Sequence, residues 1–189
     1  MKKLLFLFSI SGFLACHSGE GNTGSTDSIS DSSHKNDSSS VSGPTSATKG
    51  DADFMSAVTD AGMTEIQASQ AAEQLSKNQR VKDFAAMMIR DHGSWGDQVK
   101  SIAQSRNVSL PAAISDDHQK AVSDLQKKSG RAFDRAYMHM MVHDHEGALK
   151  DFQGAQSTVQ DSALLKFVNN TIPGIQMHLD SAKAIDKGI

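Results

Sequence analysis

The chain of 189 residues predicts an all-α fold, arranged as an up-down antiparallel four-helix bundle. Three observations favour it. The period-two alternation typical of strands is absent, and aromatic residues make up only 5% of the chain. Apolar residues also recur at steps of four and three, a spacing that places side chains on one face of a helix. Four stretches long enough to cross a bundle show this pattern.

Residues 1–16 have the form of a secretory signal, in which a basic start precedes an apolar run too short to span a membrane. The Leu-Ala-Cys order at its end resembles a bacterial lipobox, although Phe13 stands where an aliphatic residue is usual. The resemblance implies that Cys16 carries acyl chains and anchors the chain by lipid in the bacterial cell envelope. We expect the protein at the outer membrane, facing the periplasm or the cell surface. An ordinary signal peptide, with Cys16 as one apolar residue, is the alternative.

Residues 17–50 consist mainly of Ser, Thr, Gly, Asn and Asp and predict a disordered tether, because such a segment buries too little apolar surface to offset its ordering. Residues 51–189 are enough for one domain with a core. Without Lys2 and Lys3 the net charge changes from −3 to −5. A mildly acidic domain without a basic stripe argues against nucleic acid as a partner. The single cysteine excludes an intrachain disulfide.

The first two long helices are expected over residues 52–76 and 79–106. Asp51 or Asp53 is the expected N-cap of the first. Each apolar face contains one polar group, a carboxylate at Glu65 and an imidazole at His92. The two faces consist of Phe54, Val58, Ala61, Glu65, Ala68, Ala72 and Leu75, and of Val81, Ala85, Met88, His92, Trp95, Val99 and Ile102.

The connection to the second pair of long helices contains one short extra helix, predicted over residues 116–128 and ended by Ser129-Gly130. The third long helix follows and ends near Thr158. The fourth begins at Asp161 or Ser162 and contains Pro173, which removes a backbone hydrogen bond. Each of these helices has one histidine on its apolar face. The faces consist of Met138, Met141, His145, Ala148, Phe152 and Ala155, and of Leu164, Val168, Thr171, Ile175, His178, Ala182 and Ile185.

These four polar groups are expected to meet in the core. Short turns make each pair of helices antiparallel, and Glu65 and His92 each lie about 13 residues, or roughly 20 Å, from the first turn. His145 and His178 lie about 15 and 18 residues from the second turn, a mismatch of roughly one helical turn. A carboxylate and three imidazoles at one depth fit one transition-metal ion, either zinc, iron, manganese or copper. A buried hydrogen-bonded cluster that fixes the helix register is the alternative.

Other candidate groups are weaker. His139 and His143 are spaced for chelation on the outer helix face, and Asp91 suits a supporting or surface role. Asp134 and Tyr137 are expected to form a hydrogen-bonded pair at one end of the bundle. Several methionines resemble copper ligands but are more typical of core packing. These are Met87, Met88, Met138, Met140, Met141 and Met177.

Residues 53–185 resemble the bacterial family called domain of unknown function four-one-four-two, a secreted module similar to the ferritin-like superfamily. The residues that support the match are Glu65, Asp91-His92, Phe133-Asp134, Tyr137, His145, Ile172-Pro173 and His178. The segment MMVHDHEGAL also resembles part of another ferritin-like family associated with metal. The resemblance implies a ferritin-like bundle in the cell envelope and metal binding, and it implies no established activity.

The sequence favours a membrane-tethered bundle that binds one transition-metal ion through Glu65, His92, His145 and His178. The alternative is a metal-free interaction or structural module of the envelope. A dinuclear oxidase is disfavoured because Glu65 is the only glutamate on the four faces and no Glu-x-x-His pair accompanies it. No P-loop, dinucleotide fingerprint or nucleophile motif indicates an enzyme.

Overall fold

The computed structural model describes residues 46–189, in which every regular element is a helix. This confirms the all-α prediction for the described part of the chain. The helices are α1 (Lys49–Leu75), α2 (Gln79–Ser105), α3 (Asp116–Gln126), α4 (Gly130–Thr158) and α5 (Ser162–Asp186). The predicted lipidation site, Cys16, and most of the predicted tether lie outside the described residues.

The start of α1 differs from the prediction, because Thr48 is its N-cap and accepts a hydrogen bond from the backbone N–H of Asp51 at 3.1 Å. Asp51 is only 2% exposed and has another role. Its two carboxylate oxygens accept the backbone N–H groups of Gln160 and Asp161, each at 3.1 Å. The expected cap at Asp51 or Asp53 was therefore wrong. Asp51 instead joins the start of α1 to the turn between α4 and α5.

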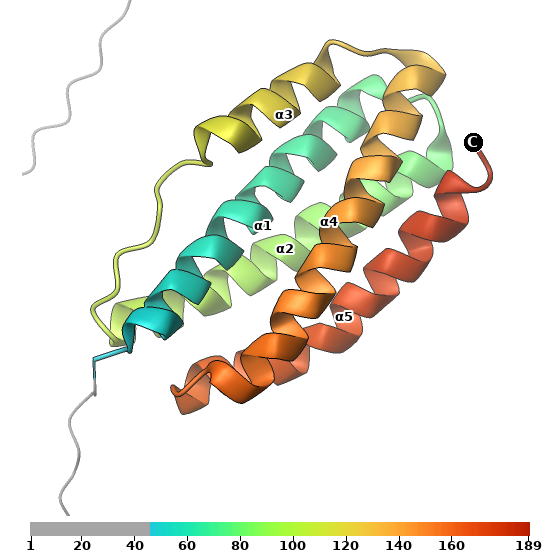
Figure 1. The fold of residues 1–189 in the computed structure, drawn as a ribbon. Helices are drawn as coiled ribbons and strands as arrows, with labels where there is room; N and C mark the ends of the chain where they lie inside the picture. The colour runs from blue at the N-terminus through green and yellow to red at the C-terminus, as the bar shows by residue number, and fades with distance from the viewer. Residues whose placement is uncertain (1–45) are drawn as a thin grey trace, which may run out of the picture. The chain divides into compact units, whose positions relative to one another are not determined.

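The direction of the long helices follows from two core clusters. One contains the end of α1, the start of α2, the start of α4 and the end of α5, together with α3. The other contains the opposite ends of the same four helices. Thus α1 and α5 run one way, and α2 and α4 run the other way (Figure 1). The expected up-down order holds within each pair but not between α2 and α4, because the connection that includes α3 returns the chain to the end where α2 began.

Burial on the helices mostly follows the expected apolar faces. All seven predicted positions of α5 are buried, and the helix continues through Pro173. The face of α1 is rotated from the prediction, since Ala61 and Leu75 are exposed while Met55 and Ala71 are buried. The helices packed against α1, chiefly α2 and also α3 and α4, determine which of its apolar side chains lie inside.

Candidate metal centre

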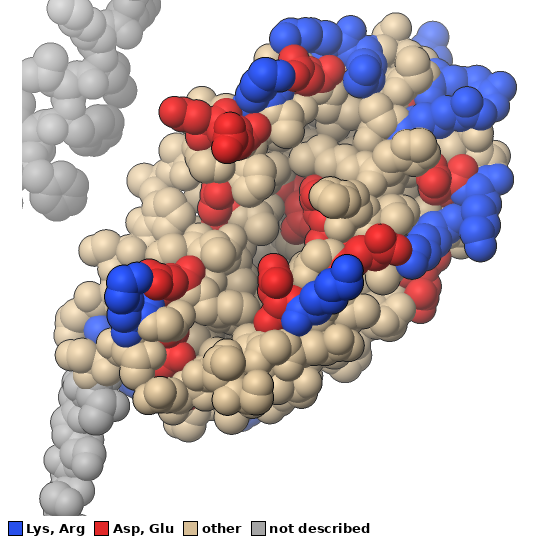
Figure 2. All heavy atoms as spheres, in the orientation of Figure 1, with Lys and Arg blue, Asp and Glu red and all other residues tan. Residues whose placement is uncertain are grey.

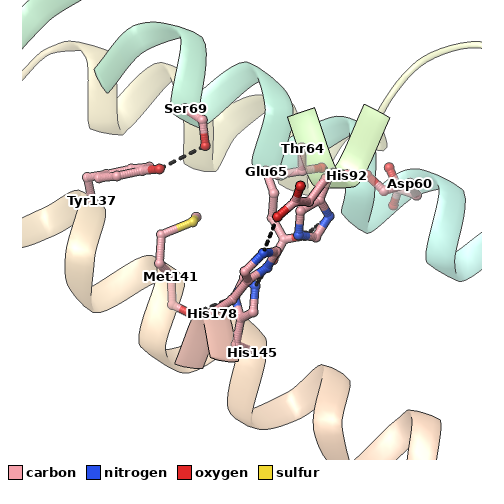
Figure 3. A network of polar contacts seen from close by, with 10 residues as sticks. Asp60, Thr64, Glu65, Ser69, His92, Tyr137, Met141, His145 and His178 are labelled. Carbon is pink, nitrogen blue, oxygen red and sulfur yellow. Dashed lines mark hydrogen bonds and ion pairs between the residues drawn. The ribbon is translucent and has the colours of Figure 1, made fainter. Parts of the chain in front are cut away.

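The four polar residues predicted for the core lie together, one from each long helix (Figure 3). All are buried: Glu65 is 5% exposed, His92 8%, His145 1% and His178 0%. Nδ1 of His92 lies 3.0 Å from Oε2 of Glu65. Nε2 of His145 lies 3.3 Å from Nδ1 of His178. The four residues therefore form one buried cluster at one depth.

The mismatch of one turn between His145 and His178 disappears for a geometric reason. Side chains on an α-helix tilt towards its N-terminus. Because α4 and α5 are antiparallel, the imidazole of His145 leans away from the turn that joins them, and that of His178 leans towards it. The two rings consequently meet although their backbone positions are offset.

Glu65 binds two of the histidines. Besides His92, its Oε1 lies 3.3 Å from Nδ1 of His145. Burial by itself raises the pKa of Glu65, but the facing imidazole of His92, with smaller effects from the other two histidines, lowers it below its ordinary value. The carboxylate is therefore ionised and accepts hydrogen bonds, so Nδ1 of His92 is the nitrogen that carries the proton.

The protonated nitrogens of the other two histidines are also determined by acceptors. Nδ1 of His145 lies 2.9 Å from the carbonyl oxygen of Met141, which can only accept. Nε2 of His178 lies 3.1 Å from Oδ2 of Asp91. Burial raises the pKa of Asp91, but hydrogen bonds from His178 and Arg90 lower it below its ordinary value, so this carboxylate also accepts. Asp91 thus supports His178 from α2.

The ring nitrogens that do not face these acceptors are the ones that can offer lone pairs, and they lie in one small volume. Nε2 of His92 is buried without a hydrogen-bond partner among the described residues. One nitrogen from each of His92, His145 and His178 lies within 4.8 Å of the others. Two lone pairs that face each other at 3.3 Å repel, yet about 3.3 Å is the separation of two ligands around a tetrahedral ion with bonds of 2.0–2.1 Å.

The environment keeps at least two of these rings neutral. Burial lowers the pKa of His145, although Glu65 opposes the effect. Burial likewise lowers the pKa of His178 to about 4, against the opposing influence of Asp91. A metal binds only the neutral form of imidazole, so both histidines are ready for coordination at neutral pH.

Trp95 forms one wall of the cluster. Its ring centroid lies 4.7 Å from that of His92 and 5.1 Å from that of His178. Trp95 also packs against Gly174, one helical turn before His178 in α5, where an added Cβ would lie 2.6 Å from Cζ2 of Trp95. Gly174 therefore provides the space that Trp95 needs beside the histidines. The signal for Trp95 was present in the sequence, one turn after His92 on the same helix face.

Several expectations change at this level. The expected fourth ligand, Glu65, stays a prediction: its two oxygens face Nδ1 of His92 and Nδ1 of His145, and the three nitrogens that lie within 4.8 Å of one another come from His92, His145 and His178. The expected pair of Asp134 and Tyr137 was wrong, since the Tyr137 hydroxyl lies 2.8 Å from the Oγ of Ser69.

The two exposed histidines among the other candidates lie apart from the histidine cluster. His139 is 68% exposed and pairs with Asp186, and His143 is exposed. Met88, Met138 and Met141 are fully buried core residues. Neither His139 nor His143 is one of the three convergent imidazoles.

Comparisons with known proteins place this arrangement among other helical domains. A solved structure described as a DUF305 fragment from Deinococcus radiodurans has a TM-score of 0.68 and 11% identity, and the match covers 76% of this chain and 99% of that one. The structure of CopM in the Cu(II)-bound form has a TM-score of 0.63 and 18% identity, covering 73% of this chain and 96% of that one. At such identities the likeness shows the fold alone.

No curated protein matches the chain. The family described as "Domain of unknown function (DUF4142)" matches residues 36–185. This range includes all five helices up to Ile185 and every residue of the histidine cluster. The chain therefore belongs to the DUF4142 family, which confirms the resemblance found in its sequence.

Proposed function

We propose that this protein is an envelope lipoprotein whose ferritin-like four-helix bundle binds one copper ion through His92, His145 and His178. Glu65 and Asp91 are positioning residues that hold the protons on the far side of these rings. Such carboxylate partners of metal-binding histidines orient the rings and raise their basicity. The observation that supports the proposal most is the meeting of three buried lone-pair nitrogens, one of them without any partner.

The ligand types favour copper over some of the alternatives. Imidazole nitrogens suit copper, zinc and iron, whereas manganese prefers oxygen ligands. CopM, which shares the fold, was solved with Cu(II) bound. Copper also binds nitrogen ligands more tightly than the other divalent ions of its row. Zinc is the principal competitor and provides the comparison in the titration below.

Three protein ligands leave one coordination position open. Structural zinc sites use four protein ligands and are closed, while open sites exchange water or another molecule at the free position. A copper ion in this cluster is therefore suited to exchange, as storage or transfer requires, rather than to permanent structural support.

A metal-free polar network is the competing function. It satisfies Glu65, Asp91 and three ring nitrogens, but it leaves the facing lone pairs of His145 and His178 without a proton between them. Supplying that proton requires a charged imidazole, which the lowered pKa values of both rings oppose. The network also leaves Nε2 of His92 unpaired at a cost of about 1–3 kcal/mol.

Elemental analysis and titration of the purified protein test the proposal. We expect one copper ion per chain, with zinc bound more weakly, and a melting temperature that falls when a chelator removes the metal. His145→Ala is expected to weaken copper binding at least 100-fold, because it removes one of three ligands. His139→Ala on the exposed face of the same helix is the matched control and is expected to bind like the wild type. Full stoichiometric copper binding by His145→Ala would overturn the proposed site. A melting temperature unaffected by chelator would favour the metal-free network.

The cell-envelope location rests on the signal and lipobox pattern at residues 1–16. Within residues 46–189, none of the helices combines the length and apolar character needed to cross a membrane. Two or three acyl chains on Cys16 would be sufficient for stable attachment.

A further inference from the structure

A large cleft opens beside the histidine cluster. It has a volume of about 1490 Å³ and is lined mainly by α1, α2 and α4, with a few residues of α3, of α5 and of the connection before α3. Glu65, His92 and His145 are among its lining residues. Figure 2 shows the molecular face hollowed between α1 and α4, on the side where the two helices can be followed in Figure 1. The cleft therefore connects the proposed copper site with the outside.

Glycines in the helices leave this space empty. Six glycines lie away from the helix ends, and five of them line the cleft: Gly62, Gly93, Gly96, Gly147 and Gly154. An added Cβ at each of the last four would meet nothing within 4 Å. Glycine in a helix interior costs roughly 0.5–1 kcal/mol relative to alanine. No packing contact requires glycine at these four positions. What they share is that a larger side chain at any of them would occupy the cleft, so we interpret them as keeping the cleft open.

An unpartnered polar group lies at the inner end of the cleft. The side chain of His92 lines the cleft, is 9% exposed, and has no hydrogen-bond partner at Nε2. A metal ion bound to His92 would therefore lie next to the cleft. Because a site of three histidines leaves one coordination position open, a molecule in the cleft can reach that position.

The walls of the cleft limit which molecules fit. Aromatic and aliphatic side chains supply much of the lining, among them Phe54, Trp95 and Phe152. Clefts of this kind bind molecules with an apolar body and a few well-placed polar atoms. Among the charged residues of the lining, carboxylates outnumber lysines: Asp53, Glu65, Asp97, Asp144, Glu146 and Asp151 against Lys100 and Lys150. This charge disfavours an anion.

We infer that the cleft binds a small neutral molecule with an apolar body and one donor atom, which takes the open coordination position of the bound metal. The inference rests on the proposed copper site and adds its ligand class. The apolar body lies among the walls formed by α1, α2 and α4, and the donor atom points to the histidine cluster.

Two nitrogen bases of matched donor strength test the inference on the copper-loaded protein. Pyridine offers the donor alone, and 4-phenylpyridine adds an apolar ring. Binding is followed by the visible absorption and electron paramagnetic resonance of Cu(II), with the copper content measured after each titration. We expect 4-phenylpyridine to bind at least tenfold more tightly than pyridine, because burial of a phenyl ring on this scale is worth at least that factor. Biphenyl-4-carboxylate, an anion of similar size, is expected to bind at least tenfold more weakly than 4-phenylpyridine.

Cleft-filling variants separate the cleft from the metal site. Gly147→Leu is expected to retain copper and to reduce the preference for 4-phenylpyridine over pyridine to less than threefold. Gly154→Leu, farther from the histidines, serves the same purpose if the first variant loses copper. Ala86→Leu, on an exposed position of α2 outside the cleft, is the matched control and is expected to keep the wild-type preference.

The possible outcomes distinguish failure of the ligand inference from failure of the proposed copper binding. A wild-type protein that binds no copper would overturn the proposed function and, with it, the ligand. If the protein binds copper stoichiometrically, three results would overturn the ligand inference alone. These are equal affinity for pyridine and 4-phenylpyridine, no change in the Cu(II) spectra on titration, and tighter binding of biphenyl-4-carboxylate than of 4-phenylpyridine. An unchanged preference in both cleft-filling variants would do the same.

Discussion

At His178 the hydrogen-bond partner determines which nitrogen is available. Its Nε2 donates to Asp91, so Nδ1 faces His145. Glu65 and the carbonyl of Met141 act similarly on His92 and His145. Each acceptor thereby turns a lone pair towards a common point, and the arrangement of protons matters as much as the identity of the three histidines.

Burial of His178 predicts acid sensitivity of the metal-free protein. Its pKa is about 4 in the folded chain against 6.5 for the free group, so below pH 6.5 the unfolded state binds more protons. The contribution of His178 is fully present above pH 6.5 and is lost as the pH falls towards 4, amounting to roughly 3 kcal/mol. Urea denaturation in chelator at pH 7, 5.5 and 4.5 measures the loss.

His178→Asn is expected to lack this part of the pH dependence, whereas His139→Asn on the exposed face is expected to retain it. If the wild type and His178→Asn lost equal free energy of unfolding between pH 7 and 4.5, the imidazole would not be the group responsible. Glu65 contributes at lower pH, since its lowered pKa confines its effect to the range below about 4.5.

Among the helices, the turn between α4 and α5 is fixed by a residue that is distant in sequence. Asp51 in the first turn of α1 accepts both N–H groups there, and Arg106 at the end of α2 pairs with Asp161. The start of α1, the end of α2 and the turn between α4 and α5 are thus held together at one end of the bundle. The position of α5, and therefore of His178, depends on this junction.

Asp51→Ala is expected to destabilise the protein by about 2–4 kcal/mol, because it leaves two backbone N–H groups without their carboxylate. Chemical denaturation of the metal-free protein measures the change. Asp53→Ala is the matched control, because Asp53 is exposed on the same helix turn and its one ion pair within residues 46–189 is with Lys49, a contact worth less than about 1 kcal/mol. Equal effects of the two substitutions would contradict a special role for Asp51.

For the whole molecule, the proposed anchor predicts how the protein is held in the cell. Cells grown with an alkyne-labelled fatty acid are expected to incorporate the label into the wild type and not into Cys16→Ser. Mass spectrometry of the N-terminal peptide is expected to show two or three acyl chains on Cys16. A wild-type chain without label, cleaved at another residue, would indicate an ordinary signal peptide.

Much of the histidine cluster was accessible from sequence, because each of its members interrupts an apolar face of regular spacing. A polar side chain in such a face must be paired inside the bundle, and the lengths of the helices place Glu65 level with His92. The start of α5 was also signalled by local chemistry, because Asp161 is its N-cap.

The sequence by itself determined that the chain is helical, which face of α5 is buried, and that one carboxylate and three imidazoles face the core. These follow from interactions within a few residues along one helix. Only the tertiary structure decided that α2 and α4 are parallel, that Asp51 binds the distant turn, that Asp91 supports His178, and that glycines of three helices border one cleft. Those features depend on how separate helices are oriented and packed against one another. The spacing of residues within one helix does not specify that orientation.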